Sequence, residues 1–247
     1  MDRDFRQGHL DIDFPTEPFR SVFRLLAGSA VLFFANLRFL AAVTLLVYLP
    51  AKLALQFVLY VLNVPTGGMV AYLALDVSDL VLSALVIPAV IYGLVARFRT
   101  GQTASVRESL RWGRRQWGKT LWNIFKVEVT VALWGALLVI PGLVAMVKLI
   151  FAEAIVAIEA DRETDVLARS RGLTKGHGWR IFLVLLPLMA ASLVGTFLIL
   201  GAFEGAAYSR VVVALADSLL SVGGQFTTVA VLLMYLGVAG PAAPAKA

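Results

Sequence analysis

Eight charged side chains lie inside or beside long apolar segments of this sequence, and they are its clearest candidates for chemistry. They are Lys52, Asp76, Asp79, Lys126, Glu128, Lys148, Glu153 and Asp217. A charge is costly in hydrocarbon, so such residues pair with one another or line the path of an ion, a proton or a polar headgroup. We favour structural pairs between helices, or side chains that reach the interface, over a polar path through a bundle.

Helical depth predicts one specific pair. At ~1.5 Å per residue, Lys52 lies about 21 Å along its segment from Arg38, and Asp79 lies about 27 Å along the next segment from Arg97. Lys52 can therefore meet Asp79, while Asp76 lies on the same face about 31 Å from Arg97. The other polar groups are expected within their own segments: Lys126 with Glu128, Lys148 with Glu153, and Asp217 with Gln225.

Motifs for catalysis or for binding a cofactor are missing from the sequence. The chain has no cysteine and only two histidines, His9 and His177, which excludes thiolate chemistry and argues against a histidine-built metal site. No nucleophile elbow, zinc-protease motif, phosphate-binding loop or dinucleotide fingerprint is present. We therefore expect a protein that is not an enzyme and that has no cofactor.

Composition indicates that lipid is the solvent for much of the chain. Hydrophobic residues make up 60% of its 247 residues and charged residues 15%, and the mean hydropathy is +0.83. Too little polar surface remains to coat a water-soluble globule of this size. We attribute the net charge of +6 to basic residues that flank the membrane segments on the cytoplasmic side, and we do not expect nucleic-acid binding.

The predicted fold is an all-α polytopic bundle in which six transmembrane helices form three hairpins. A span needs about 20 apolar residues. The middle hairpin is expected to turn at Pro141-Gly142. The six predicted spans cover residues 37–62, 70–96, 120–140, 143–158, 180–200 and 211–238.

Each hairpin is predicted to follow a cytoplasmic, interfacial amphipathic helix. The first begins near Phe19, the second near Ser105, where Ser105 and Glu108 form a capping box, and the third near Thr164. Residues 1–18 form a cytoplasmic lead, residues 19–238 a single membrane domain, and residues 239–247 a disordered tail. Breaks before each hairpin, at residues 36–38, 118–120 and 178–180, suggest a weak triplication. Basic inner loops in any hairpin-built protein explain the same pattern equally well.

The most basic inner segment runs from Arg97 to Lys119 and carries Trp112 and Trp117, which suit the headgroup zone. Basic residues near an anionic leaflet attract its headgroups. We therefore expect anionic lipid to be a partner, together with a protein partner or a second copy of the chain. The predicted lipid contacts are Arg107, Arg111, Arg114, Arg115, Lys119, Lys175 and Arg180.

Four short stretches carry a resemblance: Ile140-Pro-Gly-Leu, Val147-Lys-Leu, Ala168-Arg-Ser and Leu173-Thr-Lys-Gly-His-Gly-Trp-Arg. This pattern, over roughly residues 139–186, resembles the membrane domain attached to some glycerophosphoryl diester phosphodiesterases and related free-standing six-span bacterial proteins. Gly172 departs from it, because the pattern has a bulky residue there. The matching residues are Pro141, Gly142, Lys148, Ser170, Thr174, Lys175, Gly176, Trp179 and Arg180.

Charged inner segments and nearly uncharged outer turns predict that both termini lie in the cytoplasm. The resemblance implies a fold and a compartment, the bacterial inner membrane. It transfers no activity, because the soluble catalytic barrel has no counterpart here. The leading hypothesis is a non-catalytic membrane protein that binds anionic lipid or a protein partner in envelope or lipid homeostasis. The alternative is a transporter or channel for an ion or small polar solute. A polar cavity reaching Lys52, Glu128, Lys148 or Asp217 would favour the alternative.

Overall fold

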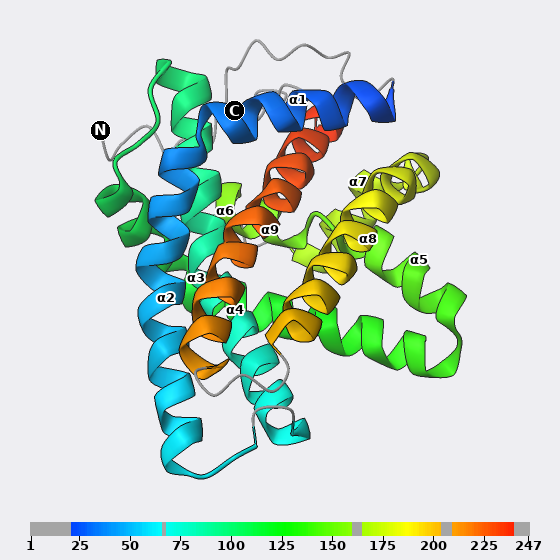
Figure 1. The fold of residues 1–247 in the computed structure, drawn as a ribbon. Helices are drawn as coiled ribbons and strands as arrows, with labels where there is room; N and C mark the ends of the chain where they lie inside the picture. The colour runs from blue at the N-terminus through cyan, green and yellow to red at the C-terminus, as the bar shows by residue number, and fades with distance from the viewer. Residues whose placement is uncertain (1–20, 66–67, 160–164, 204–208, 240–247) are drawn as a thin grey trace.

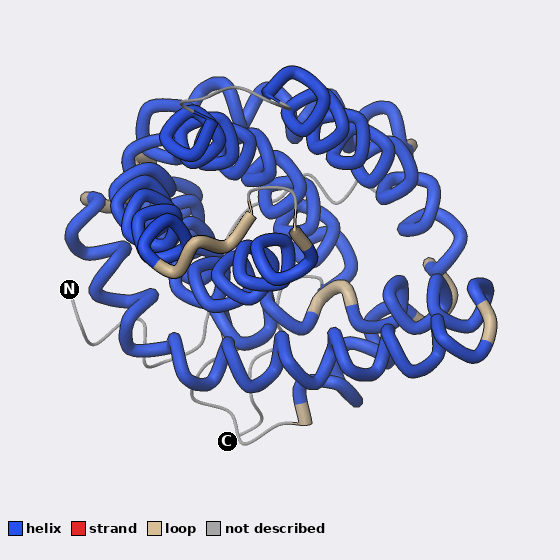
Figure 2. The backbone as a smooth tube through the Cα atoms, turned by 60° about the horizontal axis from the view of Figure 1, so that its bottom comes forward, coloured by secondary structure: helices blue, strands red, loops and turns tan. Residues whose placement is uncertain are grey.

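The computed structural model describes residues 21–65, 68–159, 165–203 and 209–239. Every regular element in these ranges is a helix (Figure 2). The predicted N-terminal lead and almost all of the predicted C-terminal tail lie outside the described residues. An all-α bundle is therefore the observed fold class.

Five segments of the described chain are helices long and apolar enough to cross a membrane. This is the architecture of a multi-pass membrane protein. They are α2 (Leu37–Val61), α3 (Met69–Thr100), the pair α5 (Val139–Leu149) and α6 (Ala152–Ile158), α8 (Gly178–Phe203) and α9 (Ser209–Ala239). The other helices are α1 (Val22–Ala35), α4 (Val106–Leu137) and α7 (Val166–Thr174).

Helix α1 lies across one end of the bundle, whereas α2 turns away from it and runs along the bundle (Figure 1). The chain changes direction at Asn36, which is buried. The Asn36 Oδ1 accepts hydrogen bonds from Arg97 (2.6 Å) at the end of α3 and from Thr103 (3.1 Å) in the following loop. Asn36 thus ties the start of α2 to the end of α3.

Helix α4 differs from the prediction of a separate interfacial helix and span. The capping box of Ser105 and Glu108 starts it as predicted, but the helix then continues through Gly118 and Thr120 without a break. Its buried stripe holds small and polar residues, which let two helix backbones approach closely: Ser109, Gly113, Gln116, Thr120 and Asn123.

Contacts with α3 explain why α4 does not lie alone at the interface. A Cβ on Gly113 would lie 2.3 Å from the carbonyl oxygen of Leu85, so only glycine fits there. Trp117 donates a hydrogen bond to the carbonyl of Val81 (3.0 Å), and Trp112 stacks on Tyr92. Both tryptophans therefore pack on α3, and the prediction that they serve the headgroup zone was incomplete.

The turn between α4 and α5 occurs at Leu138, which has extended backbone angles (φ −158°, ψ 140°). The prediction of a turn at Pro141-Gly142 is wrong, because Pro141 is the third residue of α5. Proline is tolerated in a first helical turn, where its missing N–H would have no partner within the helix. A Cβ on Gly142 would lie 2.7 Å from Cα of Gly135, so glycine allows the two arms of this hairpin to close.

The core of the bundle joins side chains from α1, α2, α3, α5, α6, α8 and α9 around the fully buried Phe151. The hairpin of α4 and α5 extends sideways from this core (Figure 1). Its tip exposes apolar side chains that suit contact with lipid: Leu133, Trp134, Leu137, Leu138, Val139 and Ile140.

Candidate functional site

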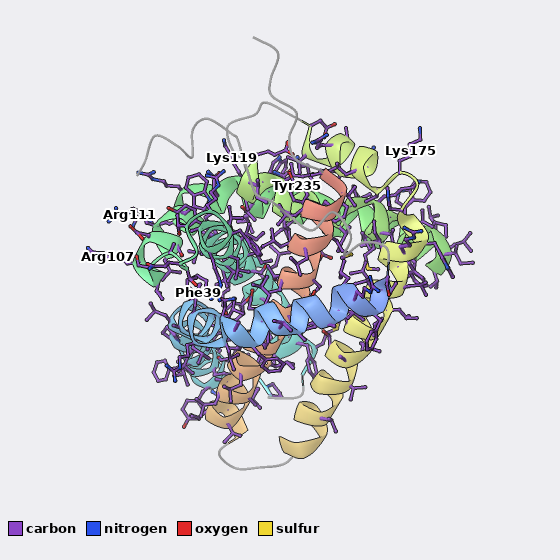
Figure 3. The ribbon with its side chains drawn as sticks, turned by 90° about the horizontal axis from the view of Figure 1, so that it is seen from above. Phe39, Arg107, Arg111, Lys119, Lys175 and Tyr235 are labelled. Carbon is purple, nitrogen blue, oxygen red and sulfur yellow. The ribbon has the colours of Figure 1, made fainter. Side chains whose placement is uncertain are left out.

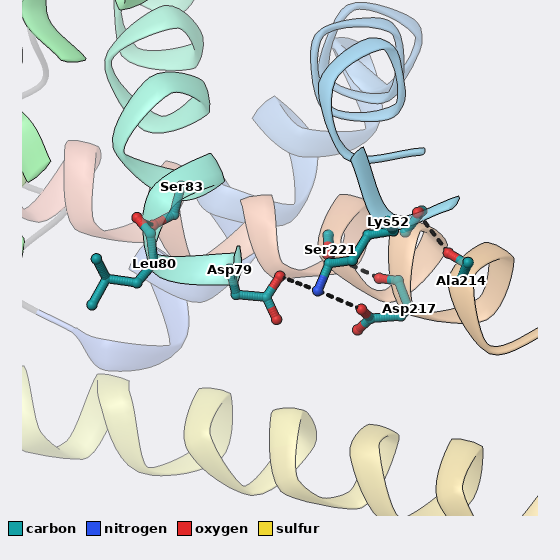
Figure 4. A network of polar contacts seen from close by, with 8 residues as sticks. Lys52, Asp79, Leu80, Ser83, Ala214, Asp217 and Ser221 are labelled. Atoms are coloured by element: carbon teal, nitrogen blue, oxygen red, sulfur yellow. Dashed lines mark hydrogen bonds and ion pairs between the residues drawn. The ribbon is translucent and has the colours of Figure 1, made fainter. Parts of the chain in front are cut away.

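A buried ion triad joins three helices. Lys52 of α2 is 0% exposed, and its Nζ lies 2.5 Å from Oδ1 of Asp79 on α3 and 2.7 Å from Oδ2 of Asp217 on α9 (Figure 4). The contact predicted between Lys52 and Asp79 is therefore present. Asp217 was expected beside Gln225, but it pairs with Lys52 because α9 packs against α2.

The triad carries one more carboxylate than it has ammonium groups. The side chains of Asp79 and Asp217 are 42% and 24% exposed, respectively, whereas Lys52 is sealed. An ammonium group has three donors, so Lys52 can serve both carboxylates at once. The arrangement holds α2, α3 and α9 together and leaves the negative charge on the more accessible side.

Next to the triad, a cavity of about 380 Å³ lies among α2, α3, α4, α5, α6 and α9. Asp79 belongs both to the triad and to the cavity wall. Its described wall contains the carboxylates of Asp79, Glu128 and Glu153 and no lysine, arginine or histidine. The uncharged polar groups of the wall are Tyr48, Ser83, Ser221, Gln225, Thr227 and Thr228.

Two of these acids have no counter-ion in the described part of the chain. Glu128 comes from α4 and Glu153 from α6, and both line the cavity. Neither forms a hydrogen bond or an ion pair with a described residue. The wall therefore offers negative charge that the protein itself does not neutralise there.

Two deeply buried polar side chains line the same space. Gln225 is 5% exposed. Its Nε2 donates a hydrogen bond to the carbonyl of Ser221 (3.4 Å), but its Oε1 has no hydrogen-bond partner. Tyr48, also 5% exposed, lines the cavity from α2. An unpaired buried acceptor costs about 1–3 kcal/mol, so the cavity suits a ligand that donates hydrogen bonds.

Glu153 is positioned by a break in the fourth predicted span. The helix stops at Leu149 and restarts at Ala152. At this break the buried hydroxyl of Ser170, from α7, accepts a hydrogen bond from the N–H of Phe151 (3.3 Å) and donates one to the carbonyl of Lys148 (2.9 Å). Ser170 thus connects α7 to the segment that carries Glu153.

A second contact secures the far end of α6. Glu159 accepts hydrogen bonds from Tyr235 of α9 (2.7 Å) and from Arg169 of α7 (3.3 Å). Asp165 caps α7 by accepting from the N–H groups of Leu167 and Ala168. The start of the third predicted cytoplasmic helix is thereby fixed beside the cavity-lining segment.

Some predicted polar residues lie away from the cavity. Lys148 and Asp76 are exposed, and Lys126 lies over the ring of Trp122 at 6.0 Å. The grouping of Lys126 with Glu128 and of Lys148 with Glu153 was therefore wrong, because only the acid of each group faces the cavity.

The seven basic residues predicted as lipid contacts are all exposed. Viewed from above, Arg107, Arg111 and Lys119 lie toward one side of the molecule and Lys175 lies on the other (Figure 3). Five of the basic residues belong to α4, where they lie outside its buried stripe.

The remaining residues of the resemblance serve local structure. Thr174 is buried and donates to the carbonyl of Arg171 (3.2 Å). Gly176 adopts φ 83°, which a residue with a side chain rarely does, and it turns the chain from α7 into α8. Trp179 stacks on Phe182 near the start of α8.

Of the polar part of α9, sequence reasoning named Gln225, but it did not single out Ser221, Thr227 or Thr228, nor Tyr48 and Ser83 on other helices. The available signal was the run Ser221-Val-Gly-Gly-Gln-Phe-Thr-Thr228 inside an otherwise apolar helix. Small and polar residues in a span mark a packed or hydrated face.

Among the described residues, no group of three or more acids and histidines is arranged to hold a metal ion. No protein-family description, no curated protein and no solved structure matches the chain. The resemblance to the phosphodiesterase-associated membrane domain therefore stays a prediction.

Proposed function

We propose that the protein is a non-catalytic transporter or channel that carries a cationic solute through the acid-lined cavity. The observation that carries this proposal is a cavity of about 380 Å³ whose described charged wall residues are all acidic. Ligand sites span about 300–1,000 Å³. Helix pairs that serve packing alone do not need an open space beside them.

In this proposal the second half of α4, residues 120–137, supplies a sixth crossing, and both termini lie on the cytoplasmic side of the bacterial inner membrane. The exposed apolar tip of the α4–α5 hairpin supports this crossing. The basic residues of α3 and α4 then follow the positive-inside rule.

The test is uptake by proteoliposomes driven by an inside-negative potential. Potassium, sodium and phenethylammonium should be compared in vesicles with the parent protein, with Glu153→Gln, and with Lys148→Gln as the control from the exposed surface. We expect uptake of a cation by the parent and the control, and its loss in Glu153→Gln. Absence of uptake of every tested cation above protein-free vesicles would refute the proposal.

A second candidate function, binding of anionic lipid, is favoured by the exposed basic face of α4. Each basic residue near an anionic leaflet contributes about 1 kcal/mol. The variant Arg111→Gln, Arg114→Gln, Arg115→Gln should lose the thermal stabilisation that the parent gains in nanodiscs of rising phosphatidylglycerol content. Equal stabilisation of the two proteins would reject lipid binding by this face and favour a protein partner.

A further inference from the structure

We infer that the cavity binds an amphiphilic organic cation, a protonated primary or secondary amine with an apolar body. Its ammonium group lies between Glu128 and Glu153. This inference rests on the proposed function and names the class of solute that the cavity accepts.

The charge and the acceptors favour an ammonium group. Glu128 and Glu153 lack counter-ions within the described chain, and Gln225 presents a buried oxygen without a partner. An ammonium group supplies a positive charge and several N–H donors together. A ligand with an ammonium group therefore matches both the charge and the unpaired acceptor of this wall.

The rest of the wall favours an apolar body over a bare ion. Aliphatic side chains from several helices complete the cavity, among them Ile87, Ile91, Ile124 and Val231. A dehydrated metal ion requires several converging oxygen ligands, and the described residues contain no group of three or more acids and histidines placed to hold one. The size of the cavity also exceeds the space that a single inorganic cation fills.

Lys52 explains why the ammonium is expected beside Glu128 and Glu153 and not beside Asp79. Asp79 is already paired with the Lys52 ammonium at 2.5 Å, which it shares with Asp217. The acids of the wall thus differ: Asp79 has a lysine partner behind the wall, whereas Glu128 and Glu153 have no partner among the described residues.

Isothermal titration calorimetry in detergent tests the inference with phenethylammonium, its neutral analogue 2-phenylethanol, and potassium chloride. We expect saturable binding of phenethylammonium only. Glu128→Gln with Glu153→Gln should weaken it about tenfold or more, since two charged acceptors are lost. Gln225→Met, which keeps all charges, should weaken it by a smaller factor, and Lys148→Gln should not change it.

The inference would be overturned by the absence of saturable phenethylammonium binding, or by binding that the two glutamine substitutions leave unchanged. Equal binding of 2-phenylethanol would also overturn it, because it would show an apolar pocket without charge recognition. Potassium uptake by proteoliposomes together with absent ammonium binding would refute this inference and leave the proposed function standing. Ammonium binding without uptake of any cation would refute transport and leave the binding site standing.

Discussion

Replacing Lys52 with methionine should destabilise the protein by about 3 kcal/mol. Methionine keeps most of the apolar stem, so the change removes the charge and creates little empty space. Asp79 and Asp217 then lose the ammonium that lies 2.5 and 2.7 Å away. Removing one partner of a buried ion pair costs about 3–5 kcal/mol, and the partial exposure of both carboxylates places the expected cost at the lower end.

The origin of this loss is tested by a compensating variant, Lys52→Met with Asp79→Asn and Asp217→Asn. Because the stranded carboxylates are gone, its stability should return to within about 1 kcal/mol of the parent. Unfolding in mixed micelles of dodecyl maltoside and dodecyl sulfate can be followed by the fluorescence of the five tryptophans. Lys148→Met, at an exposed lysine, is the matched control.

Two outcomes would refute this reasoning. If the compensated variant is as unstable as Lys52→Met, the carboxylates do not depend on the ammonium, and the loss has another cause. If Lys52→Met is as stable as the Lys148→Met control, the three side chains do not form a buried triad.

Three further predictions concern the scaffold. Ser170→Ala should lower the free energy of unfolding by about 1–3 kcal/mol, because the broken helix loses the hydroxyl that satisfies its backbone groups; unchanged stability would mean that the bridge is dispensable. Gly113→Ala should destabilise the packing of α4 on α3. Gly118→Ala, where a Cβ meets nothing within 4 Å, should raise stability slightly or leave it unchanged. A thermal shift assay in which Gly113→Ala unfolds at the same or a higher temperature than Gly118→Ala contradicts the observed contact. In this cysteine-free chain, a single cysteine at Asn63 should react with an impermeant thiol reagent added outside the cell. A single cysteine at Gln102 should react only when the reagent reaches the inside; its reaction from the outside would reverse the proposed topology.

Features set by the length and spacing of apolar segments could be predicted from the sequence. The helical bundle follows from apolar runs of sufficient length. The contact of Lys52 with Asp79 follows from helical depth, because neighbouring antiparallel spans place residues of similar depth side by side. Asp217 could not be assigned in the same way, since no local signal shows that α9 returns to pack against α2.

Angular position around a helix explains the wrong groupings. Lys148 and Glu153 are five residues apart, which places them about 140° apart around a helix, and the helix also breaks between them. Lys126 and Glu128 are two residues apart and point to nearly opposite faces. The position of a residue along its helix was therefore not enough to predict which side chains lie together.

The continuous course of α4 and the cavity depend on packing between distant segments. Gly118 resembles a helix breaker in sequence, but a single glycine costs about 1 kcal/mol in a helix, which contacts with α3 outweigh. The cavity depends on the space that α4, α6 and α9 leave between them. Its best sequence signal was polar composition, in Glu128, Glu153 and the run that contains Gln225.

The most direct measurement of the central claim is the reactivity of a cysteine inside the cavity toward charged reagents. Gly224 lines the cavity, and a Cβ there meets nothing within 4 Å. In Gly224→Cys, a cationic methanethiosulfonate should react about tenfold faster than an anionic one of similar size, because the wall attracts cations. Adding Glu128→Gln and Glu153→Gln should remove this preference, and Gly118→Cys, on the basic face of α4, should favour the anionic reagent. Equal rates for both reagents at Gly224→Cys, or a preference that survives the glutamine substitutions, would contradict a cavity that selects cations.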